Sequence, residues 1–299
     1  MILLSTPNEI RHHIAAVEQT RKITGAMEMV ASNRMRRVMN HIEQNNKYFD
    51  YVQKTMKQIL SSDENISHEY LRERPGNNTT YIVISGDKGL CGSYNSAVLE
   101  LALSRYQESP ENTLITVGNT AEDFFLRRGI IPEITLLGIA QDPTLARTRV
   151  FSREVMRIYD EELTDEVRVI YTSFYGESKN TPVERRLLPL MLQDYDDITD
   201  VPVLYDIEYH PSKQVVFDML VPQYVLGILF GVTVQAYASE HYARMNAMRS
   251  ATLNAKEMMD DLKTRYNMAR QSAITNEISE ITGAAEILRN GDSTYGKQK

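Results

Sequence analysis

The chain of 299 residues is 42% hydrophobic, which is enough apolar content for one or two domains with a sizeable core. Its single cysteine, Cys91, excludes an internal disulfide and fits a reducing compartment. The net charge of −7 is unevenly spread, with +4 in residues 1–60, −12 in residues 61–211 and +1 in residues 212–299. This acidic balance argues against nucleic acid as a partner, although the basic N-terminal part can meet an acidic protein.

The sequence shows no targeting segment. Neither a secretory apolar region nor an Arg/Ser-rich transit segment is visible before the first helical pattern. The longest nearly uncharged apolar run, around residues 224–238, is short for a membrane span and has polar flanks. We therefore expect an intracellular soluble protein without direct membrane insertion.

A long helix is predicted at the N-terminal end. From residue 31 to residue 59, mostly apolar side chains recur at alternating spacings of four and three, which is the a/d seam of a coiled coil. A similar stripe begins at residues 10–17. Within this helix, the Met-rich stretch 23–37 ends in a basic edge made of Arg34, Arg36 and Arg37.

The middle of the chain alternates short β-branched runs with helical stretches. The runs lie at residues 79–85, 113–117, 133–137 and 166–174, and the helical stretches at residues 93–106, 119–128 and 143–162. This alternation predicts an α/β fold with a Rossmann-like, mostly parallel and doubly wound sheet. Residues 181–190 are expected to add an edge strand.

The C-terminal part repeats the heptad pattern. Spacings of three and four continue from residue 238 to residue 273, and the stripe then shifts by one to residues 274–288. Pro222 can occupy the first turn of this helix, and no proline follows it. One helix could therefore extend to about Leu288, a length of about 100 Å.

Neither long helix can bury its stripe alone, so we expect the two to form an antiparallel coiled coil. The predicted organisation is an N-terminal arm (1–74), an inserted α/β domain (75–210), a C-terminal arm (211–288) and a flexible tail (289–299). The Pro-containing stretches 72–78 and 208–213 are the expected hinges. The methionines of the arms either fill gaps in the seam or form a soft contact surface.

The most enzyme-like stretch is "SGDKGLCGSYN" at residues 85–95. A strand, a Gly-rich turn and a helix start can cradle phosphate. However, Gly86, Gly89 and Gly92 fit neither the dinucleotide fingerprint nor the phosphate loop, which needs a lysine before its serine. The favoured interpretation is a tight turn with a helix cap.

No other pattern predicts chemistry. The six histidines lack metal-ligand spacing, no nucleophile motif is present, and the acidic residues of 194–200 are expected to be solvated. Gly227 and Gly231 indicate close packing of the C-terminal helix on the inserted domain. We therefore predict no catalytic residue, no metal site and no cofactor.

Three segments together resemble a known family. They are "IRHHIAAVEQTRKITGAMEMVASNRMRR" (10–37), "SGDKGLCGSYNS" (85–96) and "ASEHYARMNAMRSATLNAKEMMDDLKTRYNMARQSAITNEISEITGAAEIL" (238–288). In order and spacing they are similar to the γ subunit of F-type ATP synthase. The rest of the inserted domain matches that family only in its strand–helix pattern.

The resemblance implies a central-stalk rotor. The coiled coil would lie inside the hexamer of α and β subunits, and the α/β domain would sit on the membrane c-ring beside the ε subunit. Ion flow would turn the ring, and the asymmetric coil would bias each β subunit between open and closed states. The chain itself would be non-catalytic and peripheral to the cytoplasmic face of a bacterial membrane.

The resemblance also assigns roles to residues at the start of the coil and near its middle. Met27 and the basic edge would face the acidic lever tips of the β subunit. Glu240 and Arg244 match charged positions that the family ties to coupling.

A further segment, "ARQSAIT" at residues 269–275, matches the family's catch. There, Arg270 and Gln271 would hydrogen-bond to β carboxylates, with Thr275 and Glu277 nearby.

The sequence departs from the family in three places. Gly25 stands where a lysine is common, which removes a charge beside Met27 and costs roughly 1 kcal/mol of helix propensity. The chain continues beyond the family's usual end, and the paired regulatory cysteines of chloroplast versions are absent. Two other functions stay open from the residues alone: a Rossmann-like small-molecule binder, and a coiled-coil adaptor unrelated to ATP synthase.

Overall fold

The computed structural model describes residues 6–61, 66–174, 180–191 and 208–295, and its side chains except those of 39–47 and 286–295. The chain divides into two compact units. One unit contains residues 29–247, and the other combines residues 1–28 with residues 248–299.

The larger unit is built on a five-stranded sheet in the order β3-β2-β1-β4-β5. The strands are β1 (Thr79–Ile84), β2 (Thr113–Val117), β3 (Ile134–Leu136), β4 (Glu166–Thr172) and β5 (Pro182–Leu188). The first four are mutually parallel, and β5 pairs antiparallel with β4 at the edge. The strands predicted from β-branched runs, including the edge strand, are confirmed.

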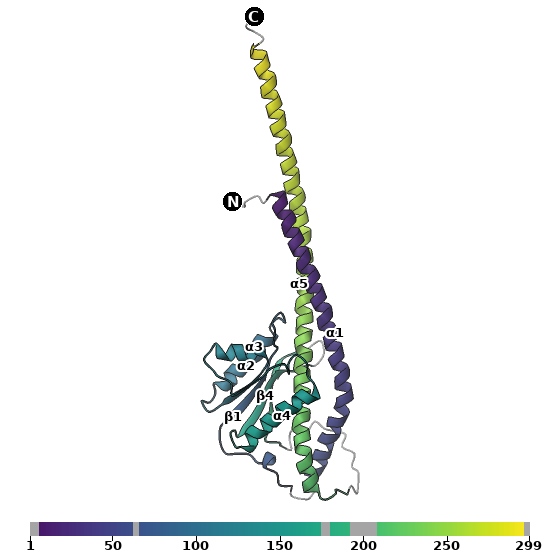
Figure 1. The fold of residues 1–299 in the computed structure, drawn as a ribbon, viewed down its shortest axis with the longest axis vertical. Coiled ribbons are helices and arrows are strands. Elements are labelled where there is room, and N and C mark those ends of the chain that lie inside the picture. Colours follow the sequence, from purple (N-terminus) through teal and green to yellow (C-terminus); the bar gives the residue numbers. More distant parts are fainter. Residues whose placement is uncertain (1–5, 62–65, 175–179, 192–207, 296–299) are drawn as a thin grey trace. The chain divides into compact units, whose positions relative to one another are not determined.

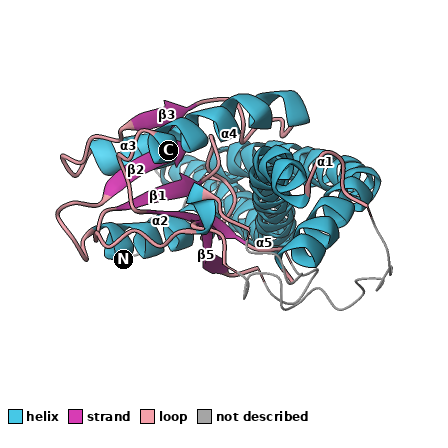
Figure 2. Cartoon of the chain, turned by 90° about the horizontal axis from the view of Figure 1, so that it is seen from below, coloured by secondary structure: helices cyan, strands magenta, loops and turns pink. Residues whose placement is uncertain are grey.

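Helices cover both faces of this sheet (Figure 2). On one face, α2 (Tyr94–Tyr106) and α3 (Asn119–Leu126) pack on side chains that alternate along β1, such as Tyr81 and Val83. On the other, α4 (Leu145–Asp160) packs on Ile82 and Ile84 together with parts of the two long helices. Burial on both faces explains why β1 is a continuous apolar run.

The two long helices are α1 (Pro7–Leu60) and α5 (Lys213–Tyr295) (Figure 1). A short 3₁₀ helix, η1 (Glu69–Leu71), follows α1. Pro222 lies inside α5 and not in its first turn, so that prediction was wrong. The helix begins earlier because Phe217 and Val221, which precede the proline, are buried in the sheet core, and this burial offsets the hydrogen bond that Pro222 cannot donate.

Within the smaller unit, α1 and α5 pair as predicted for an antiparallel coiled coil. Ile10 and Val17 of α1 form one apolar cluster with Ala255, Met259 and Leu262 of α5. A hydrogen bond between Thr24 and Thr252 and an ion pair between Glu28 and Arg249 continue this pairing. Residue numbers rise along one helix as they fall along the other, so the two helices of the coil are antiparallel.

Candidate functional site

The loop that joins β1 to α2 is held in a tight turn at the carboxyl edge of the sheet. The backbone N–H of Gly86 donates to Oδ1 of Asn95 at 2.9 Å, and the Gly86 carbonyl accepts from the backbone of Thr120 at 3.3 Å. Leu90 and Gly92 adopt positive φ angles of 62° and 59°. The glycine-rich stretch is therefore a tight turn tied to α2 through Asn95 and to α3 through Thr120.

This turn lies at the topological switch point of the sheet. The chain leaves β1 toward β2 on one side, and β4 returns to the other side of β1. In doubly wound sheets, ligands bind in the crevice outside the carboxyl ends of the strands at such a point. The crevice between the ends of β1 and β4 is therefore where this fold would hold a ligand.

Helix α5 occupies that crevice. The hydroxyl of Tyr94 donates to the carbonyl of Ala236 at 3.0 Å, and the hydroxyl of Ser239 donates to the carbonyl of Thr172, the last residue of β4, at 3.1 Å. A methyl group on Gly86 would lie 2.8 Å from Cδ of Glu240. A side chain at position 86 would therefore require the Glu240 carboxylate to move from its place against the backbone of the turn.

An ion pair between Glu240 and Arg244 fills the crevice. Nη2 of Arg244 lies 2.6 Å from Oε1 of Glu240, and both side chains are about one-tenth exposed, at 11% and 9%. The same guanidinium nitrogen donates to the carbonyls of Lys88 and Gly89, both at 3.2 Å. Burial raises the pKa of Glu240, and Arg244 opposes that effect.

Beside the ion pair of Glu240 and Arg244 lies the buried imidazole ring of His241, which is uncharged. It is 3% exposed, and its ring centroid lies 4.3 Å from that of Tyr237 in an edge-to-face contact. Burial lowers the pKa of His241 to about 3, with further lowering by the positive charges of Arg244 and Arg34. A histidine in this position does not gain a proton at physiological pH.

The crevice is thus occupied by side chains of α5, chiefly those of Glu240 and Arg244. Within the turn, Asn95, Thr120 and Arg244 bond to the backbone of Gly86, Lys88 and Gly89, and the one cysteine, Cys91, is buried with its thiol pKa raised by desolvation. Among the described residues, no group of three or more His, Cys, Asp or Glu side chains could hold a metal ion.

The structure places the predicted contact residues in different environments. Glu240 and Arg244 are brought together with the turn at 85–93, which joins two of the three segments that carried the resemblance. The three arginines of the basic edge are exposed on α1. Two of them, Arg34 and Arg37, line a hollow of about 520 Å³.

The remaining candidates lie in the smaller unit. Met27 is half-buried, and the side chains of Arg270, Gln271, Thr275 and Glu277 are exposed. The hydroxyl of Thr275 donates to the backbone carbonyl of Gln271 at 2.9 Å. Their roles toward a β subunit stay predictions.

Sequence reasoning missed several residues that build the junction. Tyr94, Asn95 and Ser239 make its cross-links, and Asp87 accepts the backbone N–H of Asn119 at 2.8 Å to cap α3. The signal available was the position of Asp87 and Asn95 in the Gly-rich stretch, where such side chains commonly bond to the backbone. Nothing in the sequence marked Ser239.

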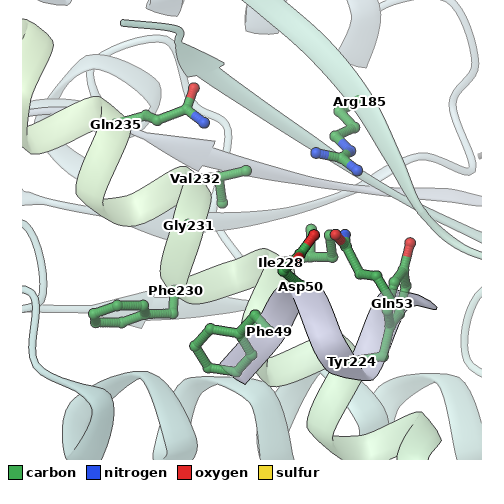
Figure 3. A pocket seen from close by; sticks show the side chains of 11 residues that line it. Phe49, Asp50, Gln53, Arg185, Tyr224, Ile228, Phe230, Gly231, Val232 and Gln235 are labelled. Carbon is green, nitrogen blue, oxygen red and sulfur yellow. The ribbon is translucent and has the colours of Figure 1, made fainter. Parts of the chain in front are cut away.

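A second hollow, of about 450 Å³, lies between α1, α5 and β5 (Figure 3). Arg185 points into it from β5, and Gly231 leaves open space at its wall. A methyl group on Gly227 would overlap the ring of Phe49. The helix packs on the inserted domain as predicted, through Val225, Leu229 and Val232, but Gly227 itself does not mark that contact, because Phe49 of α1 takes the space that this glycine leaves.

By length and hydropathy alone, the described part of α5 contains a segment that could cross a membrane, which the apolar run at 224–238 had not led us to expect. Much of this segment is buried inside the protein. Val225, Leu229 and Val232 are at most 1% exposed and belong to the core cluster under the sheet. Such burial is typical of a helix in the core of a folded domain.

Comparison with known proteins decides the family. The family model described as "ATP synthase" matches residues 6–288. The ATP synthase gamma chain of Alkaliphilus metalliredigens is 35% identical over 283 residues, which cover 94% of this chain and 98% of that protein. The chain belongs to the ATP synthase gamma chain family. The gamma chain of Staphylococcus haemolyticus is 33% identical, covering 95% of this chain and all of that protein.

Solved structures of ATP synthases share the gamma fold. A chain of the Euglena gracilis mitochondrial ATP synthase, from a structure of OSCP, F1 and the c-ring in rotational state 3, has a TM-score of 0.69 at 18% identity. The match covers 96% of this chain and 95% of that one. A chain from the central stalk and c-ring of the Tetrahymena thermophila enzyme has a TM-score of 0.57 at 22% identity, covering 77% and 99%. The predicted fold class and family are thereby confirmed.

Proposed function

We propose that this gamma chain is the central-stalk rotor subunit of an F-type ATP synthase. It would couple rotation of an ion-driven c-ring to conformational cycling of the catalytic β subunits. Its relatives are named ATP synthase gamma chains, and its structural neighbours come from central-stalk and rotor assemblies. The chain itself would be non-catalytic, because the crevice where its fold would bind a ligand is filled by its own Glu240 and Arg244.

One observation carries this proposal. Along the last described part of α5, Ile274, Ile278 and Ile281 are 44%, 58% and 64% exposed and lie on one helical stripe. They follow the cluster in which α1 and α5 bury their apolar side chains against each other. An exposed apolar stripe of this kind indicates a partner surface, and the α and β subunits of a hexamer would supply it.

The partners follow from the same role. The coiled coil of the smaller unit would lie within a hexamer of three α and three β subunits. The α/β domain would contact the ε subunit and the c-ring. This placement supports a peripheral position at the cytoplasmic face of a bacterial membrane. The burial of the apolar segment of α5 in the core under the sheet argues against its insertion into a bilayer.

The mechanism rests on unequal contacts around the coil. The exposed Arg270 and Gln271 would reach β carboxylates in one rotational state, and Met27 with the basic edge would meet acidic segments of β. A contact made in one state only shifts the balance between states in proportion to its free energy. Rotation would therefore carry each β subunit through its states in turn.

Co-expression with the cognate α and β subunits tests the proposal. We expect one complex containing all three subunits by size-exclusion chromatography, with ATPase activity that depends on the gamma chain. The isolated chain should show neither ATP hydrolysis nor micromolar binding of Mg-ATP by calorimetry. If the chain forms a stable complex with other proteins but without α and β, a coiled-coil adaptor is favoured. If the isolated chain binds nucleotide stoichiometrically, a small-molecule binder is favoured.

A further inference from the structure

The switch-point crevice of the α/β domain is filled from within by a carboxylate. Glu240 reaches the backbone of the turn after β1 so closely that a methyl group on Gly86 would lie 2.8 Å from its Cδ atom and would displace the carboxylate. The neighbouring Ser239 is bonded to Thr172 at the end of β4, the other wall of the crevice. The carboxylate thus lies at the position where a doubly wound fold binds a ligand's anionic group.

The surroundings of the carboxylate resemble a binding site more than an accidental helix ion pair. Arg244 supplies a largely enclosed cation, 11% exposed, at 2.6 Å and also donates to the carbonyls of Lys88 and Gly89 in the turn. A cation therefore links the carboxylate to the loop. On the described part of α5, the other ion pair of this i, i+4 spacing, between Asp261 and Arg265, is exposed at 57% and 66%.

We propose that Glu240 is an internal ligand: the crevice is a binding site for a small monocarboxylate, and α5 supplies that carboxylate covalently. The site would hold α5 against the carboxyl edge of the sheet and keep the turn at 85–93 closed. Its specificity is for a small planar carboxylate, since Gly86 on one side and the guanidinium of Arg244 on the other leave little space. This inference concerns the α/β fold and does not depend on the rotor function.

Chemical rescue tests this proposal on the full chain. The substitution Glu240→Ala removes a CH₂–COO⁻ group, which is the size of acetate. The variant should melt below the wild type, because Arg244 then lies buried without its partner. Sodium acetate at 100 mM should raise the melting temperature of the variant by about 3 °C relative to sodium chloride at equal ionic strength.

Three controls define the site. Formate should also rescue, whereas trimethylacetate should not, because its bulk does not fit beside Gly86. Asp261→Ala, which removes the acid of the exposed pair on the same helix, should show no specific response to acetate. In Glu240→Ala/Arg244→Ala, the acetate effect should vanish, since the cation is gone.

The proposal is overturned if acetate and chloride have the same effect on Glu240→Ala, or if trimethylacetate rescues as well as acetate. If the variant does not accumulate as folded protein, the yield after refolding in acetate is compared with the yield in chloride. Equal yields would overturn it as well. Nuclear magnetic resonance signals of Gly86 and Gly89 should shift on acetate addition in the variant and stay unchanged in the wild type.

Discussion

The hydroxyls of Thr24 and Thr252 lie 2.8 Å apart across the antiparallel coil. Thr24 is 8% exposed, so this polar contact sits within an otherwise apolar seam. Each hydroxyl also lies near a carbonyl of its own helix, with Thr24 3.1 Å from the Arg21 oxygen and Thr252 2.8 Å from the Met248 oxygen. One hydroxyl can therefore donate across the seam while the other donates within its own helix.

This geometry predicts a small but measurable coupling between the two threonines. A single substitution, Thr24→Val or Thr252→Val, should cost no more than about 1 kcal/mol, because the remaining hydroxyl keeps a backbone acceptor. The double substitution should be close to the wild type, since valine fills the same volume without a polar group. Urea unfolding of the four proteins in a double-mutant cycle gives the coupling, expected at about 1 kcal/mol. Additive effects would mean that the hydrogen bond contributes nothing to the seam.

Gly227 and Gly231 form a matched pair on α5, and substitution by alanine should affect them in opposite directions. Gly227→Ala should destabilise the protein by about 1–3 kcal/mol, because its methyl group overlaps the ring of Phe49. Gly231→Ala should stabilise it by roughly 0.5–1 kcal/mol, because no atom lies within 4 Å of the added methyl group and alanine favours the helix.

Thermal unfolding of the two variants, measured side by side, distinguishes these effects. If Gly227→Ala is more stable than the wild type, the ring of Phe49 on α1 must move aside without lowering the free energy of unfolding. A destabilised Gly231→Ala would show that the hollow between α1, α5 and β5 is filled in solution.

His241 should give the protein a pH-dependent stability of defined sign. Its pKa is lowered to about 3 in the folded chain, against an ordinary value of 6.5, so the unfolded chain binds the proton first as pH falls. Its contribution is therefore complete above pH 6.5 and is lost progressively as pH falls from 6.5 toward 3. For one group the slope approaches about 1.4 kcal/mol per pH unit.

The measurement has two parts. The stability difference between the wild type and His241→Gln should decrease by roughly 1–2 kcal/mol from pH 6.5 to pH 5. Labelled histidine should show a His241 ring signal that does not titrate between pH 8 and pH 5 in the folded chain, and that titrates in urea. A ring that gains its proton near pH 6 when folded would contradict the burial seen here.

Local patterns predicted most of the fold. The strands are contiguous β-branched runs and the coil is a repeated spacing, so each is encoded by neighbours in the chain. The candidate site was harder, because it is made by contacts between distant segments. Arg244 and Lys88, for example, lie 156 positions apart.

The errors have the same physical origin. The position of Pro222 within α5 depends on the burial of Phe217 and Val221 under the sheet, which no local rule describes. The partner of Gly227 is a ring on α1, which the G-x-x-x-G spacing does not specify. In both cases, tertiary packing overrides the local signal.

The last prediction concerns Arg270 and Gln271, and this prediction rests on the proposed rotor function. The side chain of Arg270 is exposed and makes no hydrogen bond or ion pair with other residues that the structure describes. It directly follows Ala269, which packs beside the apolar cluster of the coil, so it flanks the seam without entering it. An arginine in this position is free to bind a carboxylate of a partner.

Replacing both residues, Arg270→Ala with Gln271→Ala, should leave assembly intact and change ATP turnover and coupled ion transport several-fold or more. A charge-assisted hydrogen bond contributes about 1.5–3 kcal/mol, and a bond made in one rotational state changes the balance between states more than overall affinity. Arg270→Lys should recover part of the activity, because a point charge cannot reproduce the two-pronged contact of a guanidinium.

ATPase rates and ion pumping in reconstituted vesicles measure the effect, with complex yield checked by size-exclusion chromatography. Arg265→Ala is the matched control, since Arg265 is an exposed arginine on the same helix whose ion pair with Asp261 stays within the chain. It should retain wild-type coupling. Wild-type rates in the double variant would show that Arg270 and Gln271 are only solvated, whereas loss of the complex would show that they serve assembly and not coupling.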